Sequence, residues 1–304
     1  MNQCLLALDI GGTFLKSCLC DREGNPLPGS FDREAVDSNG ELSVIKNAYQ
    51  SLLARMKIAA ASRGLSIVAV AADIPGPFDF KTGVSRMAHK YTSLFGVPLF
   101  PWFNEVLGYI PVRFLHDSSA FLSGASLAHP EITDCAGVMI GTGLGFAVMK
   151  EGVILENEAG GPAYSIFRRP FKDKTAEEYI SGRAVLRRYN ELSPVPSDSA
   201  KKIGDAAEAG VDPVALRVYE EIGTNLAEVI SPILSELNTR ALYLGGQISK
   251  SFCLFEKTLR EGLKGVSTLT VVEAAQDLDL AHLHGAARWL LQNDPDLLSR
   301  EARV

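Results

Sequence analysis

Residues 4–20, Cys-Leu-Leu-Ala-Leu-Asp-Ile-Gly-Gly-Thr-Phe-Leu-Lys-Ser-Cys-Leu-Cys, decide the fold. Two short apolar runs, Cys4–Ile10 and Phe14–Cys20, flank a glycine turn, and this pattern is typical of a β-hairpin. A glycine-rich turn lets backbone N–H groups approach a phosphate closely. Asp9, at the end of the first run, is a carboxylate that can hold the water shell of Mg²⁺. The same residues also suit a plain tight hairpin, so this turn alone leaves both interpretations open.

The pattern recurs in the second half of the chain. Gly137–Ile140 leads into Gly141-Thr142-Gly143-Leu144-Gly145, and Phe146–Met149 follows. The repetition hints at a duplicated fold. Two familiar phosphate motifs are excluded. The chain has no G-x-x-x-x-G-K-[ST] sequence, and the dinucleotide motif G-x-G-x-x-G fails because the sixth position from Gly141 is Phe146.

Composition restricts the class of protein. The chain has 304 residues, of which 46% are hydrophobic and 22% charged, enough for two domains with substantial cores. A net charge of −6 gives no general attraction to nucleic acid or to anionic membranes. No apolar run reaches the ~18 residues that a membrane span needs, and Asp9 interrupts the N-terminal run, so we expect neither a span nor a signal peptide. Five scattered cysteines indicate reduced thiols in a cytoplasmic protein.

Alternating strands and helices predict an α/β sandwich in each half. We expect an N-terminal α/β domain over residues 1–115, closed by the C-terminal helix 282–303, and a larger α/β domain over 116–281. The periodicity predicts further strands at 67–72, 112–115, 241–244 and 268–272. It predicts helices at 41–63, about 118–127, 175–190, 211–237 and 281–292.

Three motifs in order resemble those of the actin-like kinase superfamily. Asp9-Ile10-Gly11-Gly12-Thr13 with Lys16 resembles the first phosphate motif, Gly141–Gly145 the second, and Leu242–Ser249 the adenosine motif. Within that superfamily the chain resembles the ROK family of sugar kinases, from Leu5 to about Leu291. The stretches that carry this resemblance are Pro75-Gly76-Pro77-Phe78-Asp79, Ser181-Gly182-Arg183-Ala184 and Gly285-Ala286-Ala287. It implies an α/β two-domain actin-like (ribonuclease H-like) ATPase fold with an active-site cleft between the domains.

The resemblance implies the site residues. ATP and Mg²⁺ would be the cofactors, with Asp9 holding Mg²⁺ through water. Asp117 lies where a strand ends and a helix begins; it suits a general base for a sugar hydroxyl, although an aspartate there can also cap the helix. The ATP-binding residues would be Asp9, Gly11, Gly12, Thr13, Lys16, Gly141, Thr142, Gly143, Gly145, Gly245, Gly246 and Gln247. The sugar-binding residues would be Pro75, Gly76, His116, Asp117, Tyr164 and Glu177.

The chain departs from the family on the sugar side. Gly161 and Tyr164 stand where the family usually has a sugar-binding glutamate and histidine, and His116 stands where it usually has asparagine. His116 can contact the sugar or simply pack. Residues 165–175 contain no cysteine, so we expect no zinc site. This segment is basic instead and forms either a solvated loop or a receptor for an anionic group. Glu177 matches a later family glutamate but also reads as a surface charge.

The sequence therefore predicts ATP-dependent phosphorylation of a sugar hydroxyl, on a hexose or hexose derivative, with Asp117 as base. The alternative is a non-catalytic sugar- or nucleotide-binding regulatory protein of the same fold. Family repressors carry an additional helix-turn-helix domain, which we do not expect because the phosphate motif begins at Asp9 and no basic patch is present. A kinase of the superfamily that acts on a non-sugar substrate fits less well. We expect no nucleic-acid or membrane partner, and the resemblance is compatible with a homodimer.

Overall fold

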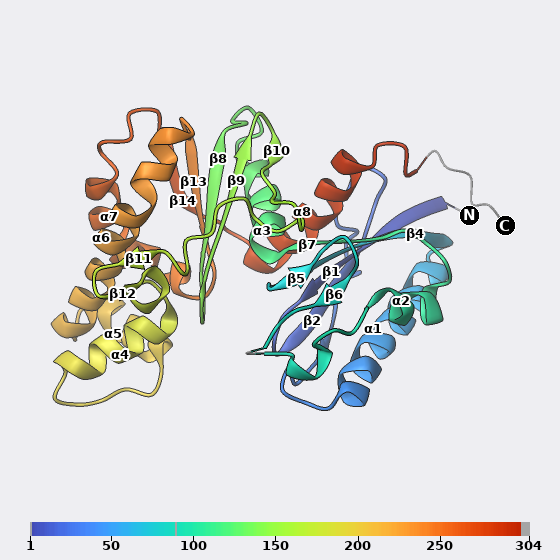
Figure 1. The fold of residues 1–304 in the computed structure, drawn as a ribbon, viewed down its shortest axis with the longest axis horizontal. Helices are drawn as coiled ribbons and strands as arrows, with labels where there is room; N and C mark the ends of the chain where they lie inside the picture. Colours follow the sequence, from blue (N-terminus) through green and yellow to red (C-terminus); the bar gives the residue numbers. More distant parts are fainter. Residues whose placement is uncertain (1, 89, 299–304) are drawn as a thin grey trace. The chain divides into compact units, whose positions relative to one another are not determined.

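A computed structural model describes residues 2–88 and 90–298, and the chain divides into two compact units (Figure 1). Unit 1 comprises Met1–Gly124, Glu156–Gly161 and Asp279–Val304; unit 2 comprises Ala125–Leu155 and Pro162–Leu278. The expected boundary at residue 115 stays a prediction. The expected closing helix 282–303 is too long: the helix ends at Asn293, residues 294–298 are not helical, and residues 299–303 lie outside the described part of the chain.

The sheet of unit 1 brings three strand ends together. Its order is β3-β2-β1-β4-β7, where β2 runs antiparallel to β1 and β3, while β1, β4 and β7 are parallel. The β1–β2 hairpin confirms the interpretation of residues 4–20. The strands are β1 (Asn2–Ile10), β2 (Phe14–Cys20), β3 (Asp32–Ala35), β4 (Leu65–Ile74) and β7 (Val112–His116). Because the carboxyl ends of parallel strands meet at one edge, Asp9, Asp73 and His116 lie along the same edge.

Helices cover both faces of this sheet, as Figure 1 shows. On one face lie α1 (Leu42–Ser62) and α2 (Phe100–Leu107). The buried residues of α1 recur at helical spacing, and Tyr49 packs edge-on against Trp102 of α2 with ring centroids 5.3 Å apart. The other face carries α3 (Asp117–Ala125) and α8 (Leu278–Asn293).

Glycines allow α3 and α8 to touch backbone to backbone. A Cβ atom on Gly124 would lie 1.9 Å from the carbonyl oxygen of Ala281, and one on Gly285 would lie 1.9 Å from that of Ala120. Neither distance is possible for a real side chain. The C-terminal helix is thus fixed against the helix that begins with Asp117.

Unit 2 repeats the sheet of unit 1. Its order is β10-β9-β8-β13-β14, with β9 antiparallel to both of its neighbours and with β8, β13 and β14 parallel. The first strand of each unit is central, the next two complete the antiparallel side, and the last two complete the parallel side. The strands are β8 (Cys135–Ile140), β9 (Leu144–Lys150), β10 (Val153–Ile154), β13 (Ala241–Gly245) and β14 (Val271–Ala274).

The helices of unit 2 bury an apolar core against this sheet. They are α4 (Gly182–Leu192), α5 (Ala200–Glu208), α6 (Pro213–Glu236) and α7 (Glu256–Gly262). Two small hairpins complete the strands: β5 (Phe78–Asp79) with β6 (Val84–Ser85) in unit 1, and β11 (Pro170–Phe171) with β12 (Lys174–Thr175) in unit 2. The 3₁₀ segments are η1 (Thr92–Leu94), η2 (Ser126–Ala128), η3 (Ala176–Glu178) and η4 (Ile248–Leu254).

The structure differs from the expected elements in several places. It adds β3, α2, α5 and α7, which the sequence did not predict, and it places the expected strand 268–272 at Val271–Ala274. The expected helix 175–190 begins only at Gly182. Ala176 and Ile180 are buried four residues apart, and this spacing imitates a helix. The true start is set by Ser181, whose extended backbone and side-chain oxygen, accepting the Ala184 N–H at 3.2 Å, cap α4.

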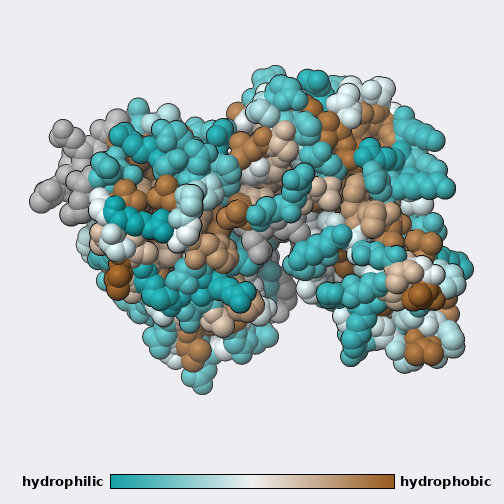
Figure 2. Space-filling model, turned by 180° about the vertical axis from the view of Figure 1, so that it is seen from behind, coloured by the Kyte–Doolittle hydropathy of each residue, from teal (hydrophilic) through white to brown (hydrophobic). Residues whose placement is uncertain are grey.

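The surface gives two further observations. Among residues 2–88 and 90–298, none of the helices combines the length and the apolar composition that a membrane crossing requires. On the face drawn in Figure 2, apolar side chains form small patches interrupted by hydrophilic ones. This pattern does not single out a self-association surface, so the homodimer stays a prediction.

Candidate functional site

The first glycine turn is held through its carbonyl groups. The Tyr91 hydroxyl donates to the Gly11 carbonyl at 2.6 Å, the Ser38 N–H donates to that of Gly12 at 3.3 Å, and the Val36 N–H to that of Thr13 at 2.9 Å. A trans peptide directs its N–H opposite to its C=O. The amides that follow these carbonyls therefore point away from the supporting chain, as a phosphate-binding turn requires.

Two carboxylates lie near the ends of neighbouring strands beside this turn. Asp9 is the next-to-last residue of β1, and it pairs in register with Lys16 on one side and Asp73 on the other. The Lys16 ammonium lies 3.2 Å from an Asp9 carboxylate oxygen. Asp73 is fully buried, and neither of its carboxylate oxygens has a hydrogen-bond partner. Burial, and then the charge of Asp9, raises the pKa of Asp73 to about 8.

A histidine from the far end of the chain completes this group. His282 of α8 is 8% exposed, and its Nδ1 lies 3.6 Å from a carboxylate oxygen of Asp73, too far for a hydrogen bond. Burial lowers the pKa of His282, but the carboxylates of Asp73 and Asp9 outweigh burial and raise it to about 9. We refer to Asp9, Asp73 and His282 as the acidic cluster.

Asp117 is held by its neighbours in sequence. It is the first residue of α3, and its carboxylate lies 2.8 Å from Nδ1 of His116 and accepts the Ser118 N–H at 2.7 Å. Burial acts to raise the pKa of Asp117, but His116 and the positive charges of Lys90 and His282 outweigh it and hold this pKa well below its usual range. About a quarter of the side chain remains exposed, so this anionic carboxylate is accessible.

The expected sugar loop lies beside His116. Pro75 and Gly76 directly follow β4; Pro75 is buried, and a Cβ atom on Gly76 would lie 3.3 Å from Nε2 of His116. The ring of Phe80 also packs against it, with its centroid 5.9 Å from that of His116. The His116 ring thus packs beside this loop and contacts Asp117, and its role in binding the sugar stays a prediction.

In unit 2 the second glycine turn joins β8 to β9. Its carbonyls are engaged like those of the first turn: the Gly182 N–H donates to the Gly141 carbonyl at 2.7 Å, and Nε of Arg183 donates to that of Thr142 at 3.1 Å. Thr142 itself is exposed. The Ser181–Ala184 element therefore supports the second phosphate motif.

The adenosine motif meets the same turn. Gly246 has φ +84°, and a Cβ atom on it would lie 2.5 Å from the carbonyl oxygen of Ile140, the residue before the turn. Only glycine fits there. The Ser249 hydroxyl donates to the Gly245 carbonyl at 2.6 Å, and Gln247 is exposed. Unit 2 thus brings three separate stretches of sequence together around one turn.

Glu177 contacts the second glycine turn. Its carboxylate accepts the Leu144 N–H at 2.9 Å and lies 2.7 Å from Arg183, and a Cβ atom on Gly143 would lie 2.7 Å from it. The Glu177 carboxylate, which the sequence assigned to the sugar, is thus already bonded within unit 2. Tyr164, the other expected sugar residue of unit 2, is half-buried and packs against the core of the unit. Both roles stay predictions.

The basic run at 168–174 forms the β11–β12 hairpin. Lys172 donates to Oδ1 of Asn225 at 2.7 Å and lies 5.0 Å from the ring centroid of Phe171, and Arg169 donates to the Val229 carbonyl.

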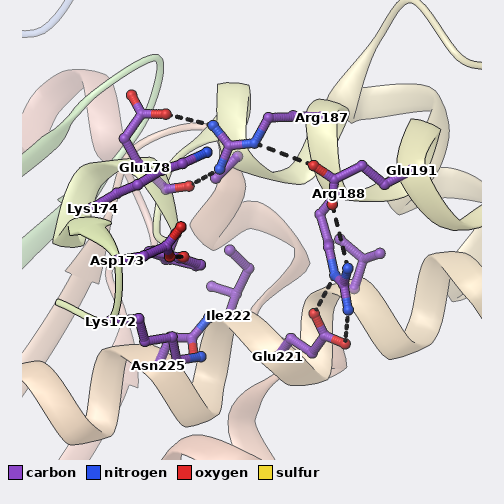
Figure 3. Close-up of a pocket in the computed structure, with 13 residues that line it drawn as sticks. Lys172, Asp173, Lys174, Glu178, Arg187, Arg188, Glu191, Glu221, Ile222 and Asn225 are labelled. Carbon is purple, nitrogen blue, oxygen red and sulfur yellow. Dashed lines mark hydrogen bonds and ion pairs between the residues drawn. The ribbon is translucent and has the colours of Figure 1, made fainter.

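Beside the hairpin is a cavity of about 360 Å³ (Figure 3). Its two arginines are paired with carboxylates: Arg187 with Glu178 and Glu191, and Arg188 with Glu191 and Glu221. This network gives an anion little net attraction.

Sequence reasoning missed Asp73 and His282. Asp73 carries a usable signal. It is a charged residue near the carboxyl end of the apolar strand β4, which is parallel to β1, so its side chain lies at the same edge of the sheet as Asp9. His282 carries a weaker one: Ala286 and Trp289 follow it at helical spacing on the buried face of α8. Neither signal reveals that the two side chains meet.

Comparison with known proteins identifies relatives over nearly the whole chain. A sequence model of the ROK family matches residues 5–163 and 171–293, and the interruption coincides with the start of the basic run. No curated protein sequence gives a significant match.

Solved structures share the fold. A glucokinase from Streptomyces griseus, in complex with glucose and AMPPNP, is 24% identical with a TM-score of 0.74, covering 93% of this chain and 98% of its own. A hexokinase from Thermus thermophilus is 21% identical, with TM-score 0.75 and coverages of 96% and 99%. A transcriptional regulator, a homologue of the Escherichia coli MLC protein, is 18% identical, with TM-score 0.80 and coverages of 98% and 81%. The expected actin-like α/β fold is confirmed.

Proposed function

The chain belongs to the ROK family, and on that premise we propose that it is an ATP-dependent sugar kinase with Asp117 as the general base. The observation that carries the proposal is the state of Asp117, an accessible carboxylate kept anionic at the carboxyl edge of the sheet of unit 1. An anionic carboxylate can accept the proton of a sugar hydroxyl as that hydroxyl attacks the terminal phosphoryl group of ATP.

A weakly basic carboxylate is sufficient for this reaction. In phosphoryl transfer the transition state is loose, and most of the catalysis comes from positioning and charge stabilisation. The base accepts the proton of the sugar hydroxyl during phosphoryl transfer, and it does not have to remove that proton before the transfer begins. The lowered pKa of Asp117 keeps the carboxylate ionised at neutral pH, where it is ready to accept a proton.

The two glycine turns are the proposed phosphate sites. Each has carbonyls engaged by its own unit and an exposed threonine, Thr13 or Thr142, that can donate a hydroxyl. Asp9, a carboxylate next to the first glycine turn, fits Mg²⁺. Bound with ATP, this ion would neutralise phosphate charge, and Asp9 would hold its water shell. Lys16, next to Asp9, adds positive charge.

The sugar would be a hexose or hexose derivative. Pro75, Gly76 and His116 form one packed group next to Asp117, which supports their assignment to the acceptor. Tyr164 and Glu177 of unit 2 are the other residues that we assign to the sugar. Because Gly161 and Tyr164 cannot reproduce the hydrogen bonds of glutamate and histidine, we expect a preference different from that of relatives that keep those residues. Some relatives are regulators, so the alternative is a regulatory protein that binds sugar or nucleotide without turnover.

The test is release of ADP from Mg-ATP across hexoses, N-acetylhexosamines and polyols. We expect turnover with one class of sugar and a loss of about 10²–10⁴ in kcat for Asp117→Asn, the contribution usual for a general base. The matched control is Asp134→Asn, which removes a carboxylate paired with Lys150 in unit 2 and leaves the site intact. Full activity of Asp117→Asn would contradict the role of the base. Binding of nucleotide and sugar without ADP release would favour the regulatory alternative.

A further inference from the structure

The acidic cluster has a feature that the kinase reaction does not explain. Asp73 is buried with both carboxylate oxygens unpartnered, and Nδ1 of His282, more than nine-tenths buried, is unpartnered as well. Buried polar atoms without hydrogen bonds cost free energy and are rare in folded proteins. Three such atoms lie close together here, and a bound ligand would satisfy them all.

The three side chains lie close together in space. One ligand atom from each of Asp9, Asp73 and His282 lies within 4.8 Å of the other two. Nδ1 of His282 is 3.6 Å from Oδ1 of Asp73. Two ligands ~2.1 Å from a tetrahedral ion stand roughly 3.4 Å from each other, so this separation suits a common metal better than a hydrogen bond.

Charge favours the same conclusion. Two carboxylates on adjacent strands repel each other, and Asp117 contributes further negative charge to this region. In the metal-free protein the imidazolium of His282, whose pKa is raised to about 9, offsets part of this charge. A divalent cation would displace that proton from His282, so metal binding releases a proton, and the cation would satisfy the orphaned oxygens together. The donor set then selects the ion: magnesium prefers oxygen ligands alone, whereas an imidazole suits first-row transition metals.

We propose that Asp9, Asp73 and His282 form a buried binding site for a divalent first-row transition-metal ion. Three protein ligands leave a fourth position for water or another oxygen ligand. The site differs from the Mg²⁺ that would accompany ATP, because it is formed by direct ligands including a nitrogen from α8. The metal ties β1 and β4 to the C-terminal helix of the same unit, so it stabilises unit 1 in the absence of any nucleotide.

The experiment uses the full chain without ATP or sugar, so its result is independent of whether the protein is a kinase. Protein stripped with a chelator is titrated with Zn²⁺ and with Co²⁺ in the presence of excess Mg²⁺. Bound metal is counted by mass spectrometry, the Co²⁺ complex is followed by its visible spectrum, and thermal unfolding is recorded. We expect one ion per chain and a rise in Tm with metal concentration.

Two variants test the ligands. His282→Gln and Asp73→Asn should each weaken binding by more than about 100-fold, beyond what loss of an outer-shell contact costs. Asp73→Asn removes an ionisable group and keeps the shape of the side chain, so we expect it to fold. The matched control is His129→Gln, which should keep the stoichiometry of metal binding. His129 also contacts two carboxylates, that of Glu131 through Nδ1 and that of Glu273 through Nε2.

Three results would overturn the proposal. One is no bound ion in the stripped and reloaded protein. Another is equal binding by wild type and His282→Gln. The third is binding of Mg²⁺ as tight as that of Zn²⁺, which would mean that only oxygens hold the ion.

Discussion

Opposing influences act on the Asp117 carboxylate. Burial favours its neutral form, whereas the imidazole of His116 at 2.8 Å and the more distant Lys90 and His282 favour the anion, and the anion prevails. His116 is held in place by its contacts with Ser118 and with the ring of Phe80. The imidazole therefore tunes the proposed base from a fixed position.

Replacing His116 should shift the pH dependence of the reaction. Asp117 must be ionised to act as a base, so activity falls as pH drops through its pKa; in the wild type that limb lies below the ordinary aspartate range. His116→Asn removes the main partner of the anion, so the pKa should rise and the acid limb of kcat/KM should move to higher pH. The measurement is a pH profile of kcat/KM, with His129→Asn as control. An unchanged profile would show that His116 does not set the pKa of Asp117.

Residues whose role is local could be predicted from sequence, and residues whose role depends on packing could not. The two glycine turns and the strand–helix junction at Asp117 were found because turn chemistry is encoded by adjacent residues. Asp73 and His282 meet only because β4 pairs with β1 and α8 packs on α3. Glu177 could be matched to a family position, but its bond to the Leu144 N–H follows from the placement of η3 under the turn.

Among the elements, the contact between α3 and α8 has the strictest requirements. Each helix contributes a glycine, and the missing side chains let the two backbones touch. α3 begins with Asp117 and α8 carries His282, so this one contact sets the separation of two groups near the carboxyl edge of the sheet. The helices themselves were expected from periodicity, but their contact was not, because a glycine in a helix does not reveal its partner.

A single methyl group should disturb this contact. In Gly285→Ala the new Cβ would overlap the Ala120 carbonyl, a backbone atom that cannot move aside like a side chain. We expect destabilisation of about 1–3 kcal/mol or more, measured by denaturant unfolding. Gly265→Ala is the control, since it adds the same methyl at an exposed glycine with no atom within 4 Å and should be neutral within about 1 kcal/mol. Equal stability of both variants would refute the tight contact.

At the scale of the whole molecule, the same strand order occurs twice on one chain that passes repeatedly between the two units. It crosses after Gly124, Leu155, Gly161 and Leu278. The stretch 159–164, where the chain departs from the family's sugar motif, spans one of these crossings. The sequence indicated two α/β halves from the repeated glycine turns, yet crossings depend on tertiary contacts that no local pattern reveals.

The crossings predict which parts of the chain lose stability together. Leu290 in α8 and Leu234 in α6 are both fully buried, the first in unit 1 and the second in unit 2. Each Leu→Ala change should cost about 2–5 kcal/mol in its own core. Hydrogen exchange followed by mass spectrometry should then show faster exchange in β1, β2 and β4 for Leu290→Ala, although these strands lie at the opposite end of the sequence. The strands β13 and β14 precede α8 in the sequence but belong to unit 2, so they should keep their protection against exchange. Leu234→Ala should give the reverse pattern. If both variants accelerate exchange equally in both sheets, the two units unfold as one body, and the division of the chain into separate cores does not govern its stability.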